Sequence, residues 1–396
     1  MNLTRIDLGF IPLVDAAPLI CCYEMGFARE EGLDLHLRSY PSWSSLRDAL
    51  CFGQLDAAHM LACVPVASAL GLGGTASVLH ALSVLSINGN VIGVSSDMAE
   101  RMQTHDFAFA DARAAGKALI AAKRDRLRIG VPFPFSMHAE LVYYWLSALG
   151  LPAPQEVTVR TVPPAQMADA LEAGELDAFC VGEPWGSRSV EAGVGKLLLP
   201  CSAIWSFAPE KVLAVRADWT QENAETAQRL TRALWRAARW LAARLHTAIV
   251  PEILSQQHYL NLPPELLEHA LTGQFVISKG GALRETQGFV EFFEGSATFP
   301  WVSQAEWIGS QLAMRTGLDP VESAKAARST FRSDIFRQAL AGTAPNLPSA
   351  SAKVEGAVAV PMTAGSIGAP LTLARNQFFD GKSFEPLTTE RSNFRR

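Results

Sequence analysis

Short apolar segments alternate with helical patterns throughout the first 70 residues of the chain. Gly32 and Gly71 stand where two of the helical patterns stop, and Ser42 or Ser44 can cap the start of another. Strands that alternate with helices in this way predict a layered α/β fold with largely parallel sheets. The predicted strands are residues 6–10, 33–37 and 55–60, and the predicted helices are residues 17–30, 42–50 and 64–70.

The composition limits the classes of function. The 396 residues are enough for two or three domains, and 34 Lys and Arg against 39 Asp and Glu give a net charge of −5. A protein that coats nucleic acid carries a basic surface, so this balance argues against direct nucleic-acid binding. No apolar run approaches the roughly 18 residues of a membrane-spanning helix, so no contact with a membrane is predicted.

The start of the chain and its cysteines bear on the cellular compartment. The first ten residues lack the basic head and the apolar core of a secretory signal. The six cysteines are sparse and lack the spaced pairs of a zinc site, which is typical of free thiols in a reducing compartment. If Met1 is the native start, these features predict a cytoplasmic protein. A strained disulfide between Cys21 and Cys22 is the alternative for that adjacent pair.

Later segments indicate how the chain is organised. Residues 49–57 resemble residues 170–178, since each has a helix end, a glycine turn and a strand, which suggests two similar α/β units. A long amphipathic helix is predicted to open at Asp218. Residues 343–366 are rich in Ala, Ser, Pro, Gly and Val, as in a linker with little to bury, and they lead to an aromatic tail, residues 378–384, that can dock on the body.

The sequence carries no catalytic signature. It has no Gly-x-Ser-x-Gly, no Walker loop, and no Gly-x-Gly-x-x-Gly placed after a strand. His138 and Cys180 are residue types that can act as base and nucleophile, but no spacing selects them from the eight histidines and six cysteines. An enzyme is therefore the weaker class.

Hydrogen-bond donors, by contrast, gather at the ends of the predicted elements. In open α/β sheets, ligands bind at the carboxyl ends of strands, where helix N-termini also point. The donors are an indole, amides, an imidazole and an ammonium, without a carboxylate among them, and a set of this kind suits a small anion. Each also has a simpler interpretation, as a packed tryptophan, a satisfied loop histidine or a solvated lysine. The residues are Trp43, Asn88, Asn90, His138 and Lys211.

Several motifs in one order resemble the nitrate and bicarbonate solute-binding proteins of ABC transporters. The resemblance spans nearly the whole chain, and the combination is far more specific than any single motif. The motifs are GFIPLVDAAPL (9–19), SW (42–43), GQLDAAHML (53–61), NGN (88–90), His138 with YW (144–145), VGEPW (181–185), PEK (209–211) with VRADW (215–219), ATFPW (297–301) and FDG (379–381).

The resemblance implies an α/β, two-lobed, periplasmic-binding-protein-like fold of type II, with a ligand cleft between the lobes. Residues 1–98 and 206–342 are expected to form the first lobe. Residues 99–205 are expected to form the second lobe, and residues 343–396 a linker and a tail that packs on the body.

The resemblance also implies a ligand set. Nitrate-binding relatives hold the anion with a tryptophan, an amide, a histidine and a lysine, which here fall on Trp43, Asn90, His138 and Lys211. Bicarbonate-binding relatives carry an acidic residue where the lysine stands, so Lys211 favours nitrate or nitrite without a metal or other cofactor. A hydrogen bond from a charged donor contributes about 1.5–3 kcal/mol against about 0.5–1.5 for a neutral one, which makes Lys211 the largest contributor. Burying Lys211 without an anion would be costly.

Transport members of this family are exported, whereas this sequence begins without a leader. It is therefore similar to cytoplasmic nitrate/nitrite sensors of the NasS type, which hold an RNA-binding antiterminator of the NasT type and release it when the anion binds. The alternatives are the nitrate-binding subunit of an ABC transporter and an enzyme related to thiamin-pyrimidine synthases. The latter carry a cysteine-rich motif that Cys21 and Cys22 do not reproduce.

Overall fold

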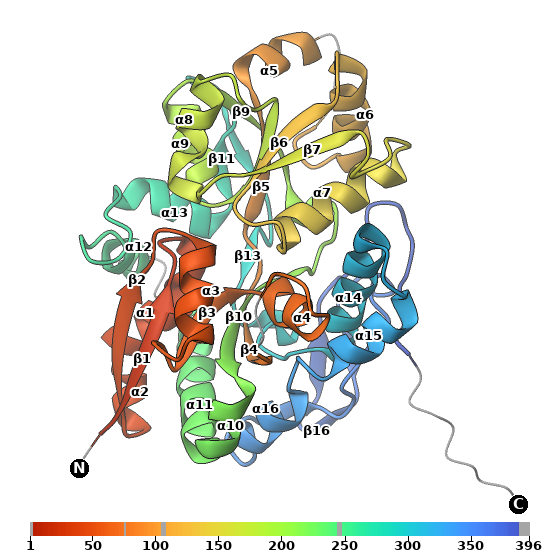
Figure 1. Ribbon diagram of the computed structural model, residues 1–396. Coiled ribbons are helices and arrows are strands. Elements are labelled where there is room, and N and C mark those ends of the chain that lie inside the picture. The colour runs from red at the N-terminus through yellow and green to blue at the C-terminus, as the bar shows by residue number, and fades with distance from the viewer. Residues whose placement is uncertain (1–2, 75–76, 104–107, 244–247, 388–396) are drawn as a thin grey trace, which may run out of the picture.

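The computed structural model describes the chain except for residues 1–2, 75–76, 104–107, 244–247 and 388–396. Two β-sheets form its framework, one in the lower half and one in the upper half of Figure 1. Helices flank both sheets, as the alternation of strand and helix patterns predicts.

The first sheet has the strand order β13-β4-β10-β3-β1-β2. Strand β1 runs parallel to β2 and β3, whereas β10 runs antiparallel to β3 and β4, and β13 antiparallel to β4. The prediction of largely parallel sheets is therefore wrong for half of this sheet, because β10 enters it from a distant part of the chain. The strands are β1 (Thr4–Phe10), β2 (Leu33–Ser39), β3 (Ala57–Leu61), β4 (Leu79–Asn88), β10 (Pro209–Arg216) and β13 (Val290–Glu291).

The second sheet has the order β7-β6-β8-β5-β9, with β6 parallel to β7 and β8, and β5 antiparallel to β8 and β9. Strand β5 lies in this sheet although it precedes residue 99, where the sequence analysis begins the second lobe. The strands are β5 (Asn90–Ser95), β6 (Leu127–Val131), β7 (Val157–Thr161), β8 (Ala178–Gly182) and β9 (Gly195–Pro200). A hairpin of β11 (Gln274–Val276) and β12 (Leu283–Glu285) packs beside it through Phe275.

Two of the helices around the first sheet, α3 and α4, begin and end within one residue of the predicted positions. Ser42 caps α3 by accepting a hydrogen bond from Ser45 N at 3.2 Å. The single helix predicted over residues 17–30 is two helices, since Gly26 takes a φ of 77° between them. The helices around the first sheet are α1 (Ala17–Glu24), α2 (Phe27–Glu30), α3 (Trp43–Cys51), α4 (Cys63–Ala69), α10 (Ala217–Glu222), α11 (Ala224–Leu241), α12 (Ile249–Leu254), α13 (Pro264–Thr272), α14 (Val302–Thr316), α15 (Pro320–Arg328) and α16 (Ser333–Leu340).

The amphipathic pattern after Asp218 is also split, into α10 and α11, and α11 buries Leu230 and Leu234 against the first sheet. Helices α5 and α6 lie between β5 and β6, and residues 104–107 between these two helices lie outside the described residues. The helices of the second half are α5 (Ser96–Met102), α6 (Ala112–Ala122), α7 (Met137–Ala148), α8 (Met167–Glu172) and α9 (Trp185–Glu191).

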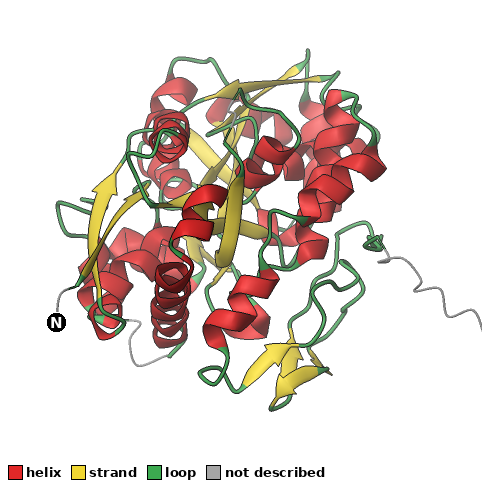
Figure 2. Ribbon diagram, turned by 60° about the horizontal axis from the view of Figure 1, so that its bottom comes forward, coloured by secondary structure: helices red, strands yellow, loops and turns green. Residues whose placement is uncertain are grey.

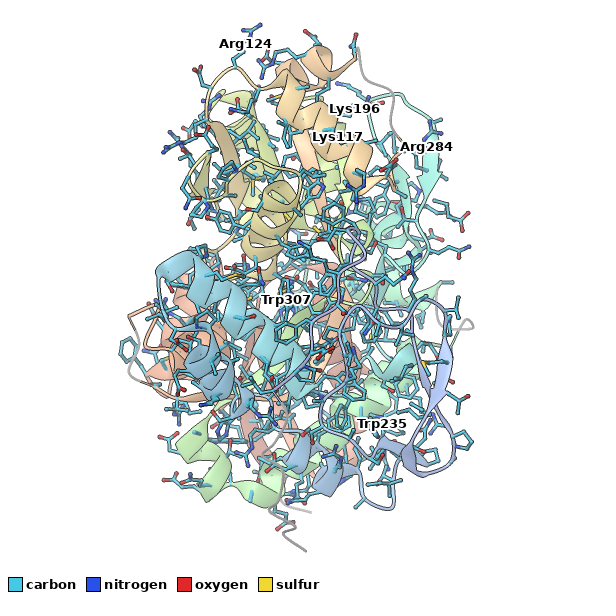
Figure 3. The ribbon with its side chains drawn as sticks, turned by 90° about the vertical axis from the view of Figure 1, so that its right-hand side faces the viewer. Lys117, Arg124, Lys196, Trp235, Arg284 and Trp307 are labelled. Atoms are coloured by element: carbon cyan, nitrogen blue, oxygen red, sulfur yellow. The ribbon has the colours of Figure 1, made fainter. Side chains whose placement is uncertain are left out.

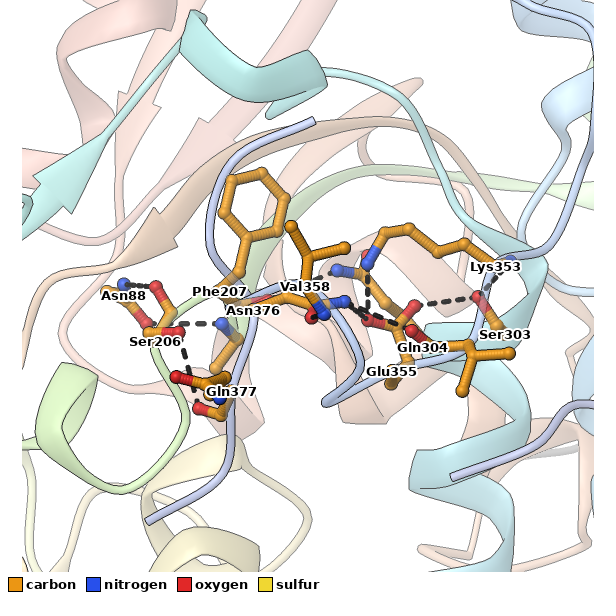
Figure 4. Close-up of polar contacts among 12 residues, drawn as sticks. Asn88, Ser206, Phe207, Ser303, Gln304, Lys353, Glu355, Val358, Asn376 and Gln377 are labelled. Atoms are coloured by element: carbon orange, nitrogen blue, oxygen red, sulfur yellow. Dashed lines mark hydrogen bonds and ion pairs between the residues drawn. The ribbon is translucent and has the colours of Figure 1, made fainter. Parts of the chain in front are cut away.

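Residues 343–366 are more ordered than the predicted linker. Leu347 is buried with Trp235 and Trp301, and Glu355 accepts a hydrogen bond from Ser303 Oγ at 2.7 Å and an ion pair from Lys353 (Figure 4). The low-complexity composition of this segment therefore does not mean that it buries little, because side chains such as Leu347 and Glu355 anchor it to the body. Two short strands of this segment, β14 (Asn346–Pro348) and β15 (Met362–Ala364), pair with β16 (Ser366–Gly368) and β17 (Leu371–Leu373), which begin at or after its last residue. These strands are seen at the lower right of Figure 2.

The aromatic tail docks on the body, as predicted. Phe378 stacks on Trp205 and Trp307, with ring centroids 4.8 and 5.8 Å apart. Figure 3 shows Trp307 near the middle of the molecule and Trp235 in its lower half. Tyr144 of α7 donates a hydrogen bond to Asp380 at 2.8 Å. The tail therefore contacts helices that belong to both halves.

Candidate functional site

Lys211 is the centre of a buried polar cluster between the two sheets. It lies on β10 with no exposed surface, and its Nζ is 2.7 Å from Oδ2 of Asp15 and 2.9 Å from Oε1 of Glu210. Of its two possible interpretations, the solvated surface lysine is therefore wrong. Burial without an anion would be costly for this ammonium, and the carboxylates of Asp15 and Glu210 supply the opposite charge.

Glu210 reaches the cluster because the strand is irregular there. Neighbouring side chains on a regular strand point to opposite faces. The pairing of β10 with β4 shifts register between Pro209 and Lys211 and again between Lys211 and Val212. A bulge of this kind re-aims side chains, so Glu210 and Lys211 both point into the cluster.

Asp15 enters from the short 3-10 helix at Val14–Ala16 that follows β1. Its Oδ1 is 3.1 Å from Nε2 of His59 on β3, and both side chains are buried. Asp15, His59 and Glu210 were not predicted as site residues, and the predicted donor set contained no carboxylate. A signal was present, since Asp15 and His59 are single polar residues within apolar runs, where a buried polar group needs a partner.

The structure brings the other three predicted residues to the same place. Trp43 begins α3 and is 1% exposed, with its ring centroid 5.4 Å from Lys211 Nζ and 5.7 Å from the His59 ring. His138 is the second residue of α7, and its Nδ1 is 3.3 Å from Oε1 of Glu210. It is therefore a buried helix residue and not a loop histidine.

Asn90 begins β5. Burial raises the pKa of Glu210, and the Asn90 amide lies close enough to that carboxyl to oppose part of the rise. Asn88 lies elsewhere, at the crossing between the sheets, with a φ of 58°. Its Nδ2 donates to Ser206 O at 2.9 Å, and its Oδ1 accepts from Ala208 N at 3.2 Å. Asn88 thus joins the two chain segments that cross there and does not line the cluster.

Burial and ion pairing compete in setting the pKa values of the cluster. Burial alone would raise the pKa of Asp15, but Lys211 and His59 outweigh it and hold that pKa below its usual range. Burial raises the pKa of Glu210 despite the opposing effect of Lys211. Burial would lower the pKa of Lys211, but Asp15 and Glu210 raise it, so the ammonium stays charged.

Both histidines are neutral at pH 7. Burial lowers the pKa of His59 in spite of Asp15, and burial together with Lys211 lowers the pKa of His138 well below its usual value. A neutral imidazole has one donor and one acceptor nitrogen. Each histidine can therefore offer a neutral donor to a ligand.

Several buried atoms of the cluster have no hydrogen-bond partner in the protein. Buried polar groups are nearly always hydrogen-bonded, so a group of such atoms facing one place indicates where a polar ligand binds. They include donors as well as acceptors, and the donors suit a small oxyanion. The atoms are Trp43 Nε1, His59 Nδ1, His138 Nε2, Nδ2 and Oδ1 of Asn90, and Oε2 of Glu210.

The cluster draws on both halves of the molecule, which are held together around it. Val14 N donates to Glu183 O at 3.1 Å, and Trp185 Nε1 donates to Pro12 O at 3.0 Å. Arg315 of α14 pairs with Glu140 of α7 at 2.7 Å. Because these contacts cross between the halves, a ligand in the cluster lies between two closed lobes.

Among the described residues, no helix combines the length and the apolar character needed to cross a lipid bilayer. No group of three or more His, Cys, Asp or Glu side chains in that part of the chain is arranged to hold a metal ion. Cys21 and Cys22 are both buried and do not form a disulfide.

Comparison with known proteins identifies the family. The model of the NMT1-like family matches residues 1–255, more than half of the chain. The chain belongs to the NMT1-like family. This NMT1-like protein is 30% identical to the nitrate/nitrite binding protein NrtA of Nostoc over 395 residues, which cover 97% of this chain and 83% of the relative.

Another relative is longer than this chain. The nitrate import ATP-binding protein NrtC of Synechocystis is 32% identical over 340 residues, 85% of this chain, and the chain spans 50% of the length of that protein. Among solved structures, the periplasmic nitrate-binding protein NrtA of Synechocystis PCC 6803 superposes with a TM-score of 0.83 at 27% identity. That alignment covers 97% of this chain and 96% of NrtA. The predicted two-lobed, periplasmic-binding-protein-like α/β fold is thereby confirmed.

Proposed function

We propose that this NMT1-like protein binds nitrate or nitrite in the cluster around Lys211, as a solute-binding protein like NrtA. The observation that carries the proposal is the meeting of a buried ammonium with unpartnered donors from both lobes: Trp43 Nε1, Asn90 Nδ2 and a nitrogen of His138. A planar oxyanion accepts several hydrogen bonds at once, and a charged donor contributes most to its binding. The identity to NrtA supports the same ligand class.

Calorimetric titration with sodium nitrate, nitrite and bicarbonate tests the proposal. Saturable binding of nitrate or nitrite is expected. In Trp43→Phe the ring stays and one donor is lost, so affinity should fall about 2- to 13-fold, the equivalent of about 0.5–1.5 kcal/mol.

Trp205→Phe is the matched control for that variant. Trp205 is also fully buried with an unpartnered Nε1, but it stacks on Phe378 of the tail. Its removal should leave the affinity unchanged. Binding of bicarbonate alone, or no binding of any of the three anions, would contradict the proposed function.

The relatives named above are transport components, which favours the solute-binding subunit of an ABC transporter as the biological setting. The sensor interpretation rests on the sequence resemblance alone, so the NasT-like antiterminator partner and the cytoplasmic location stay predictions. Gel filtration of the protein mixed with such an antiterminator, with and without nitrate, would test them. A complex that nitrate dissociates would support a sensor, and the absence of a complex would leave the transport role.

A further inference from the structure

The charges of the cluster are unusual for a site that takes an anion. Two carboxyl groups, those of Asp15 and Glu210, pair with a single ammonium, that of Lys211. Burial lowers the pKa of both His59 and His138, so neither adds a positive charge. The cluster therefore has a net charge of one negative unit before a ligand arrives. A monovalent anion would bring a second one into a buried site, where like charges repel strongly.

The titratable groups on the surrounding elements do not offset that charge. Glu140 of α7 is neutralised by Arg315 of α14, 2.7 Å away. Burial raises the pKa of Glu183, which follows β8, to about 7, so this group adds no positive charge in either form. Burial also raises the pKa of the Cys63 and Cys180 thiols well above the usual value, so both are neutral. Within the described chain, Lys211 is thus the permanent cation of the cluster.

A proton from solvent can balance the incoming charge, and the geometry shows where it would go. Asp15 pairs with the Lys211 ammonium at 2.7 Å and is hydrogen-bonded by the neutral His59 at 3.1 Å, so it stays ionised. Glu210 shares Lys211 with Asp15, and its Oε2 has no partner in the protein. Nδ1 of His138 lies 3.3 Å from Oε1 of Glu210, within reach of a shared proton.

We propose that the site takes up one proton from solvent with each anion it binds, and that the pair of His138 and Glu210 holds this proton. The proton adds to a lone pair of the His138 ring or of the Glu210 carboxylate, and the solvent species that supplies it is left as its conjugate base. The closed lobes then enclose an anion and a proton together. With the proton on His138, three negative charges, those of Asp15, Glu210 and the anion, face two positive ones. With the proton on Glu210, two negative charges face one positive charge, so in both cases the net charge stays at one negative unit. This inference rests on the proposed function.

Proton uptake has a measurable consequence. By linkage, a plot of the logarithm of the dissociation constant against pH has a slope equal to the number of protons taken up on binding. Calorimetric titration with sodium nitrate and sodium nitrite at pH 7 and pH 8, in HEPES and in Tris, measures that number in two independent ways. We expect about one proton per anion and a roughly tenfold weaker affinity at pH 8 than at pH 7.

Glu210→Gln separates this mechanism from a passive role of the carboxylate. The amide has nearly the shape of the carboxyl group and, like its protonated form, carries no charge. The variant should therefore bind the anion more tightly than the wild type at pH 8. Its affinity should be the same at pH 7 and pH 8. A passive hydrogen-bonding role predicts weaker binding and an unchanged pH slope.

Glu183→Gln is the matched control, because Glu183 is also a buried carboxyl group with one unpartnered oxygen. It should keep the wild-type slope, and loss of the slope in this variant would overturn the assignment to His138 and Glu210. Anion binding with no proton uptake would overturn the inference and leave the proposed function intact. Absence of nitrate and nitrite binding at both pH values would overturn both.

Discussion

Glu210 and Lys211 are adjacent in the chain, yet both side chains are buried in one cluster, with Nζ of Lys211 2.9 Å from Oε1 of Glu210. On a regular strand they would point to opposite faces. The register shifts of β10 turn both inward, and Asp15 then completes a carboxylate–ammonium–carboxylate group. The same irregularity therefore sets both the position of the cation and the net charge of the candidate site.

Replacing Lys211 should affect stability as well as anion binding. Lys211→Met leaves Asp15 and Glu210 buried without their cation, which should cost about 3–5 kcal/mol of unfolding free energy at pH 7. In the variant, both buried carboxyl groups should have higher pKa values in the folded than in the unfolded state. Protonation at pH 5 should therefore reduce the loss of unfolding free energy relative to the wild type. Urea unfolding at the two pH values measures it.

Lys382→Met is the control for that change, because its ammonium is largely exposed and pairs with Asp380 at 3.3 Å. A surface pair of this kind contributes about 0–1 kcal/mol. Equal costs for the two lysine variants would contradict the role given to Lys211.

His80 should make stability depend on pH outside the candidate site. It lies on β4 with its Nδ1 3.2 Å from Arg332 Nη1, and burial, aided by Arg332, lowers its pKa to about 4. An unfolded histidine has a pKa near 6.5, so its contribution to stability is complete above about pH 6.5 and is lost as the pH falls toward 4.

The matching experiment compares urea unfolding of the wild type and His80→Gln at pH 7 and pH 4.5. The variant should lose about 1–2 kcal/mol less over this range, after allowance for solvent screening of a partly exposed group. His258→Gln, at an exposed position, should follow the wild type. A His80→Gln profile parallel to that of the wild type would contradict this, because it would mean that His80 has the same pKa in the folded and the unfolded state.

The tail should contribute to the stability of the whole molecule. Phe378 is 4% exposed and stacks on Trp205 and Trp307, so Phe378→Ala should lower the free energy of unfolding by about 3–5 kcal/mol. Phe52 is 78% exposed, and Phe52→Ala should change it by less than about 0.5 kcal/mol. Thermal unfolding of both variants decides the matter, and a small effect at Phe378 would mean that the tail is dispensable.

Asn88 combines a backbone role and a side-chain role that two variants can separate. Asn88→Ala removes three side-chain hydrogen bonds, of which those with Ser206 O and Ala208 N should contribute about 0.5–1.5 kcal/mol each and the 3.5 Å contact with Gly288 O less. It also places an alanine at a φ of 58°, which costs about 1–2 kcal/mol more. Asn88→Gly removes the same hydrogen bonds but accepts that φ. Denaturant unfolding should find Asn88→Ala the less stable of the two, and the reverse order would exclude backbone strain as the cause.

The sequence alone was informative wherever local chemistry decides the structure. The α/β class followed from alternating strand and helix patterns, and the start of α3 followed from Ser42, because a cap acts within one helical turn. The docking of the tail was expected from its several aromatic residues, because burial of large apolar side chains is favourable, and Phe378 stacks on Trp205. Trp43, Asn90, His138 and Lys211 were predicted from family motifs, and the structure places them together, although their role as ligands is untested.

Only the tertiary structure decided the chemistry of the cluster. Asp15, His59 and Glu210 come from three separate segments, and their charges matter only because the fold buries them within 3.1 Å of a partner. The antiparallel entry of β10 and its register shifts depend on contacts between distant segments, which no local pattern encodes. Residue types and local propensities are properties of the sequence, whereas burial and Coulomb interactions depend on distances that exist only in the folded chain.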